Sequence, residues 1–107
     1  MIVTASSGIP GWTIREDLGL VRGNTIRARH LGRDILAGFK SIVGGEIHDY
    51  TKMMGEAREQ AIDRMIEHAE ELGADAVVNV RFSTSYVMGG AAEILVYGSA
   101  VSLEATE

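Results

Sequence analysis

The stretch that decides the fold is Gly45–Phe82, GEIHDYTKMMGEAREQAIDRMIEHAEELGADAVVNVRF. Its first part repeats apolar residues at steps of three and four, which is the period of one face of a helix. The residues of this stripe are Ile47, Tyr50, Met54, Ala57, Ala61, Met65, Ala69 and Leu72. Gly73 follows the stripe at the position where a left-handed cap residue belongs. The stretch therefore predicts one long amphipathic helix from about Glu46 to Leu72.

Gly55 interrupts this helical pattern, and a glycine inside a helix costs roughly 1 kcal/mol relative to alanine. Two interpretations stand beside each other. In the first, the helix simply tolerates Gly55. In the second, Gly55 allows a close packing contact that a larger residue would block.

Two strands follow the helix. In Ala76–Phe82 the alternation predicts one face with Ala76, Val78, Val80 and Phe82, and another with Val77, Asn79 and Arg81. Ala92–Leu103 is apolar on both faces, which is typical of a strand that is buried on both. Because two helices in one small domain have difficulty covering both faces of a sheet, we expect a second subunit to cover the remaining face.

The rest of the chain is assigned by the same criteria of apolar spacing and Gly/Pro punctuation. The predicted elements are a short strand at Met1–Ala5, a loop at Ser6–Gly11, a strand at Leu18–Arg27, a short helix at Arg33–Ile42 and a flexible hairpin loop at Ser83–Ala91. Trp12–Ile14 has two interpretations, a continuation of strand or a segment lying across the core. Gly19 and Gly23 interrupt the Leu18–Arg27 strand and are interpreted as marking a bulge.

Composition limits the possible classes of function. The 107 residues predict a single domain over 1–107, and the net charge of −5 argues against nonspecific binding to nucleic acid. The chain has no cysteine, so disulfides, thiol nucleophiles and thiolate metal sites are excluded. No signal peptide or membrane-spanning run is readable, and we expect a cytoplasmic protein without membrane insertion.

Several short segments, taken in order, resemble the YbjQ family of small bacterial and archaeal proteins. They are Met1-Ile-Val-Thr4, Leu20-Val21-Arg22-Gly23, Arg33-Asp34-Ile35-Leu36-Ala37, Ile42-Val43-Gly44-Gly45, Tyr50, Ala57-Arg58, Leu72-Gly73-Ala74-Asp75-Ala76-Val77 and Tyr97-Gly98-Ser99-Ala100-Val101. The resemblance implies an α+β subunit with an antiparallel-rich sheet of three to four strands packed on one long and one short helix. It also implies assembly into a ring-shaped homopentamer, and it carries a label of heavy-metal binding.

The residues do not predict a metal site within one subunit. Soft heavy metals prefer thiolate and thioether ligands, and no cysteine is present. His48 and His68 lie twenty positions apart on the predicted helix, about 30 Å by the helical rise, so they cannot share an ion. A site formed at a ring axis by symmetry copies of one residue remains the alternative.

Weak candidates for ligand binding gather around the start of the long helix. Backbone N–H groups at a helix N-terminus favour an anion, although the acidic Glu46 at the same place favours a plain tight turn. Arg58 is interpreted either as an ion-pair partner or as an anion ligand together with Thr4 or Tyr50. The candidate ligand-binding residues are Thr4, Gly44, Gly45, Glu46, Tyr50, Arg58 and Asn79.

No pattern of nucleophile and base stands out, because Ser6, Ser7 and Ser41 have no histidine at a defining spacing. The sequence predicts a homo-oligomeric binding or assembly module that holds a small anionic ligand or a metal between subunits. The alternatives are a hydrolase or transferase with an active site between subunits, and a structural scaffold ring. The sequence identifies no cofactor and leaves open whether the protein is an enzyme.

Overall fold

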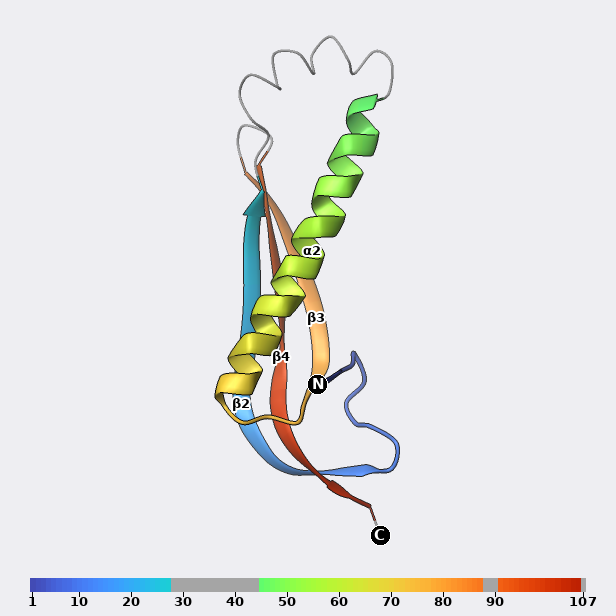
Figure 1. Ribbon diagram of the computed structural model, residues 1–107, viewed down its shortest axis with the longest axis vertical. Helices are drawn as coiled ribbons and strands as arrows, with labels where there is room; N and C mark the ends of the chain where they lie inside the picture. The colour runs from blue at the N-terminus through green and yellow to red at the C-terminus, as the bar shows by residue number, and fades with distance from the viewer. Residues whose placement is uncertain (28–44, 88–90, 107) are drawn as a thin grey trace.

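The computed structural model describes residues 1–27, 45–87 and 91–106. In chain order these residues form β1 (Ile2–Val3), β2 (Trp12–Arg27), α2 (Gly45–Glu71), β3 (Ala76–Val87) and β4 (Ala91–Ala105). The strands make one mixed sheet in the order β1-β3-β4-β2, with β1 parallel to β3 and the other pairs antiparallel (Figure 1). The α+β expectation is confirmed for this part of the chain. The short helix predicted at Arg33–Ile42 lies outside the described residues.

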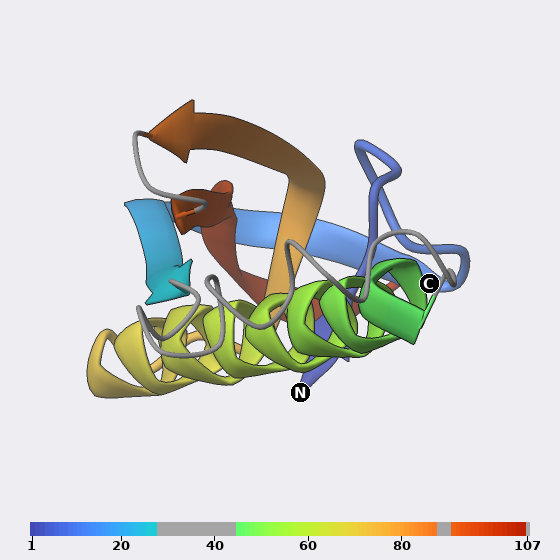
Figure 2. The ribbon, with the colours of Figure 1, turned by 90° about the horizontal axis from the view of Figure 1, so that it is seen from above.

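α2 buries the part of the predicted stripe from Met54 to Ala69, whereas the side chains of Ile47 and Tyr50 lie outside the described residues. Met54, Ala57, Ala61, Met65 and Ala69 are all buried, and α2 lies along one face of the sheet (Figure 2). Charged residues dominate the rest of the helix surface, and no helix among the described residues is long and apolar enough to cross a membrane.

A glycine cap ends α2 as predicted. Gly73 has a φ of +74°, the left-handed conformation that glycine adopts without strain. Its N–H donates to the carbonyl of Glu70 at 3.0 Å, and the N–H of Ala74 donates to Ala69 at 3.0 Å, which together form a Schellman motif. Leu72 falls in this capping turn rather than on the helical stripe and remains 41% exposed, so its predicted burial is wrong.

β2 is one continuous strand. Trp12 and Ile14 pair with Ala105 and Leu103, so the first of the two interpretations of this segment holds. The register slips between Ile14 and Glu16 and again between Asp17 and Gly19. At the second slip Gly19 has a φ of +112° and its N–H donates to the Asp17 carboxylate at 2.9 Å, which confirms a bulge there.

The sequence predicts a bulge at Gly23, and this prediction is wrong. Gly23 is buried in regular pairing with Val96, where β2 passes beneath α2. A Cβ at this position would collide with the carbonyl oxygen of Ala61 and lie 2.5 Å from the nitrogen of Met65. The glycine therefore lets the helix and the strand approach each other at their backbones.

A bulge in β3 corrects the predicted alternation of its faces. Asn79 has a φ of +55°, and the pairing with β4 slips between Val78 and Arg81. Because an extra residue shifts the alternation, Val77 and Val80 both pack in the main core with α2, whereas Val78 packs on the opposite side.

The hairpin between β3 and β4 is longer than the sequence predicts. β3 continues to Val87 and pairs there with Ala91, so the predicted loop at Ser83–Ala91 is wrong for residues 83–87. Ser83, Thr84 and Ser85 are exposed, and polar residues on an exposed part of a strand resemble a loop in sequence.

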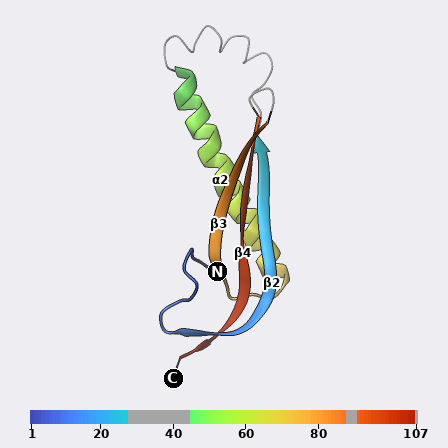
Figure 3. The ribbon, with the colours of Figure 1, turned by 180° about the vertical axis from the view of Figure 1, so that it is seen from behind.

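The two faces of the sheet are covered unequally. One face carries α2 and the main core. The other face has no helix over it among the described residues (Figure 3). A small cluster of buried residues lies there, formed by Ala76, Val78 and Val101 of the sheet with Ile9 and Leu103 packed against them.

Candidate functional site

The N-terminal segment is bound to the bulge of β3. The N–H of Thr4 donates to Val77 at 3.0 Å, and the carbonyl of Thr4 accepts from Val80 at 3.1 Å. The N–H of Asn79 donates to the carbonyl of Ser6 at 2.9 Å. Two residues of the predicted site, Thr4 and Asn79, are therefore brought together here through their backbones.

The side chain of Arg81 also binds the N-terminal segment. Its Nη1 donates to the carbonyl of Ala5 at 2.9 Å and to the carbonyl of Val80 at 2.8 Å. The first bond joins the N-terminal segment to β3, and the second is to the residue directly before Arg81 in the bulged part of the strand. The described contacts of the Arg81 side chain are therefore hydrogen bonds to the backbone.

The other predicted site residues lie elsewhere or outside the described residues. Arg58 is exposed on α2, and its Nη2 lies 3.9 Å from a Cβ built at Gly55, so this side chain runs back along its own helix. Gly44 lies outside the described residues, as do the side chains at positions 45, 46 and 50, which include the candidates Glu46 and Tyr50.

One subunit does not place the start of α2 beside Thr4. α2 contains 27 residues, which span about 40 Å at the helical rise. Thr4 binds Val77, which follows the far end of that helix (Figure 1). Residues of both groups can meet only if a second subunit supplies one of them.

Hydrogen bonds between side chains of α2 and residues of β2 were not predicted from the sequence. Gln60, Arg64 and His68, spaced four residues apart, contact Arg27, Asn24 and Arg22 of β2 in turn. We call these six residues the polar seam. Arg27 Nη2 donates to Gln60 Oε1 at 2.8 Å, Arg64 Nη1 donates to the carbonyl of Asn24 at 2.7 Å, and the N–H of Arg22 donates to His68 Nδ1 at 3.3 Å.

The spacing of the seam was visible in the sequence, since residues four apart on a helix lie on one face. The polar seam could not be recognised from this spacing because it runs directly beside the buried stripe of Ala57, Ala61 and Met65. Polar residues at that boundary resemble an ordinary solvated helix surface.

The exposed face of the sheet carries a row of cationic and phenolic side chains. Tyr97 on β4 pairs with Arg22 on one side and Arg81 on the other, and cross-strand partners lie on the same face. Both arginines are exposed. The next row consists of Leu95 on β4 and its two cross-strand partners, Asn24 on β2 and Ser83 on β3.

The described residues do not fit a site for a heavy metal. No group of three or more His, Cys, Asp or Glu side chains that could hold an ion occurs among them. The whole chain lacks cysteine, the soft ligand that such ions prefer. His30 and the side chain of His48 lie outside the described residues.

Comparisons with known proteins agree with the fold. A crystal structure of a protein of unknown function from the DUF74 family of Pediococcus pentosaceus matches with a TM-score of 0.60, at 17% identity, over 97% of this chain and 98% of that chain. At this identity the likeness shows the fold alone.

Sequence comparisons show the family. A UPF0145 protein of Thermosipho melanesiensis is 59% identical over 96% of this chain and 95% of its own length. One from Methanosarcina acetivorans is 59% identical over 96% of this chain and 97% of its own length. The model of the family YbjQ_1, described as "Putative heavy-metal-binding", matches residues 1–104. The chain therefore belongs to the YbjQ_1 family, as the order of its sequence segments indicated.

Proposed function

We propose that this protein is a homo-oligomeric assembly module, a cytoplasmic ring of five copies that holds a small anionic ligand between subunits. The observation that carries the proposal is the sheet face opposite α2, which no helix covers among the described residues and where large apolar side chains are exposed beside Arg22 and Asn24. Leu20 is 68% exposed and Ile26 is 65% exposed on that face, with Tyr97 between them on β4. Exposed apolar groups of this size are typical of surfaces that bind another protein.

A second apolar surface supports a ring rather than a simple dimer. Phe82 is 49% exposed and Tyr86 is 73% exposed, and both lie on the face that α2 occupies. α2 packs over β2 and β4 there and leaves this part of β3 uncovered among the described residues (Figure 2). Two different surfaces on one subunit suit head-to-tail contacts, which close into rings.

The ligand part of the proposal is supported by the row of Arg22, Tyr97 and Arg81. Guanidinium groups bind carboxylate and phosphate through paired N–H donors, and a phenol adds one more donor. No carboxylate stands in this row or in the next row toward Leu95. In the proposed ring, the neighbouring subunit brings its residues Gly44, Gly45, Glu46, Tyr50 and Arg58 toward Thr4 and Asn79.

Native mass spectrometry of protein purified without chelator or added metal tests both parts. We expect a five-subunit mass, with a stoichiometric excess that identifies an anion or, in the alternative, a metal ion. L20S and I26S are expected to lower the subunit number, whereas L72S, an exposed leucine in the helix cap, should leave it unchanged. A wild-type monomer at micromolar concentration would overturn the assembly proposal. A bare ring that binds no added phosphate or citrate would overturn the ligand.

A further inference from the structure

We propose that His68 is a proton-controlled latch that covers the edge of β2. In its neutral form the imidazole holds the N–H of Arg22, and in its protonated form it releases this group and opens the edge at that point. The proposal rests on the geometry of the polar seam and does not depend on the ring.

β2 lies at the edge of the described sheet, where backbone groups that point away from β4 have no strand to pair with. Arg22 and Asn24 are two residues apart, so their backbone N–H and C=O groups point to the same side of the strand, away from β4. The seam bonds use the N–H of Arg22 and the carbonyl of Asn24. These are the groups that an added strand would need.

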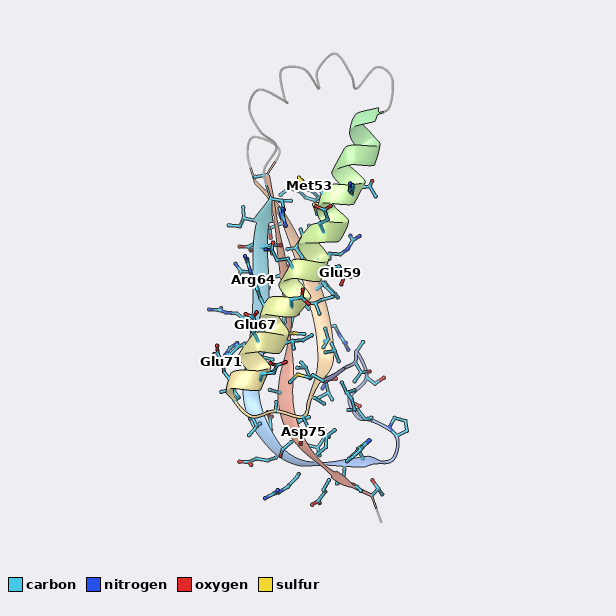
Figure 4. The ribbon with its side chains drawn as sticks, in the orientation of Figure 1. Met53, Glu59, Arg64, Glu67, Glu71 and Asp75 are labelled. Carbon is cyan, nitrogen blue, oxygen red and sulfur yellow. The ribbon has the colours of Figure 1, made fainter. Side chains whose placement is uncertain are left out.

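α2 protects both groups with side chains one helical turn apart. Figure 4 labels Arg64 on α2, whose guanidinium donates to the carbonyl of Asn24. His68 is half-buried and accepts at Nδ1. An imidazole nitrogen accepts a hydrogen bond only when it carries no proton, so this half of the cover depends on pH.

Protonation of His68 Nδ1 replaces the hydrogen bond to Arg22 with repulsion between two N–H donors. With a proton on Nδ1, two N–H donors would face each other at 3.3 Å, and the imidazole must turn away from β2. The N–H of Arg22 then meets water or another acceptor.

The charged surroundings of His68 are few. On α2, the charged residues within about one helical turn of His68 are Arg64, Glu67, Glu70 and Glu71. Arg22 is the one charged residue of 19–25 on β2, and its side chain lies with Tyr97 on the opposite face of the sheet. β4 beneath has no Asp, Glu, Lys or Arg within 96–101. The N–H of Arg22 is the described hydrogen-bond partner of the imidazole.

Amide hydrogen exchange of the isotopically labelled full chain tests the latch. The protection factor of Arg22, corrected for the intrinsic pH dependence of exchange, is followed while NMR reports the protonation of His68. We expect it to fall about fivefold as the imidazole gains its proton, the loss of one net hydrogen bond. Val96, in the centre of β4, serves as the internal control and should keep its protection.

Two variants sharpen the test. In H68A the Arg22 amide should exchange fast at every pH. R64A removes the other half of the cover, and in it the pH dependence at Arg22 should persist. Constant protection of Arg22 through the titration of His68 would overturn the latch. So would an equal fall at Val96, because that would report a general loss of stability.

Discussion

Gly23 of β2 lies against the carbonyl of Ala61 on α2 so closely that even a methyl group would have no room there. This contact sits at the middle of the helix–strand interface, between the buried side chains of Val21 and Thr25. Small residues on both elements therefore set the distance at which α2 packs on the sheet.

Replacing Gly23 by alanine should destabilise the fold by about 2 kcal/mol or more, because α2 must move away from β2 to admit the new methyl group. The measurement is urea unfolding at one fixed protein concentration. Gly8, where an added Cβ meets nothing within 4 Å, provides the control, and G8A should change stability by less than about 0.5 kcal/mol. Equal effects of the two substitutions would contradict the close approach.

Thr25 contributes the buried hydrogen bond of the same interface. Its hydroxyl donates to the carbonyl of Ala57 at 3.0 Å, and the residue is 2% exposed. T25V keeps the shape and removes the donor, so we expect a loss of about 1 kcal/mol. T13V is the matched control, since the Thr13 hydroxyl bonds to Thr106 in an exposed position and its removal should cost less.

Gly55 offers a gain in stability. A Cβ there meets only the flexible end of Arg58, at 3.9 Å, so the first interpretation, simple tolerance, holds for the described residues. G55A should stabilise the protein by about 0.5–1 kcal/mol through helix propensity. G73A should do the opposite, because an alanine at φ +74° is strained. A loss in G55A, seen as a lower urea midpoint, would indicate a packing role for the glycine in the assembled protein.

Asn79 can be tested by comparing two substitutions at the bulge. Its φ of +55° suits glycine and asparagine and disfavours a β-branched residue. N79G should be close to neutral, whereas N79V should cost about 1–2 kcal/mol. Thermal unfolding of the two variants gives the comparison. Equal stability would mean that the bulge shifts to another residue.

Much of the fold could be predicted from the spacing of apolar residues along the chain. The helix stripe from Met54 to Ala69 and the cap at Gly73 were predictable because period and punctuation are local signals. The bulge at Asn79 was not, since it depends on the N–H bonds to Thr4 and Ser6, which come from a segment far away in the chain. The role of Gly23 was missed for the same reason, as it depends on a helix that begins many residues later.

Less of the candidate site than of the fold could be predicted from the sequence. The predicted set contained both Thr4 and Asn79, which the structure brings close through their backbones, but it left out Arg81, which binds the same segment. The pairing of Arg22, Tyr97 and Arg81 depends on the register of three strands. A register is fixed by the whole sheet and cannot be read from any one strand.

The position of β4 between β3 and β2 has a consequence for how the chain folds. Val87 pairs with Ala91, four positions later in the chain, whereas Trp12 pairs with Ala105 and Arg27 with Ala92. The entropy of closing a loop is small for the first pairing and large for the second. We expect the β3–β4 hairpin to form early and the addition of β2 to limit the refolding rate. Substitutions at β2, such as T25V, should then slow refolding more than substitutions at the Val87 end of the hairpin.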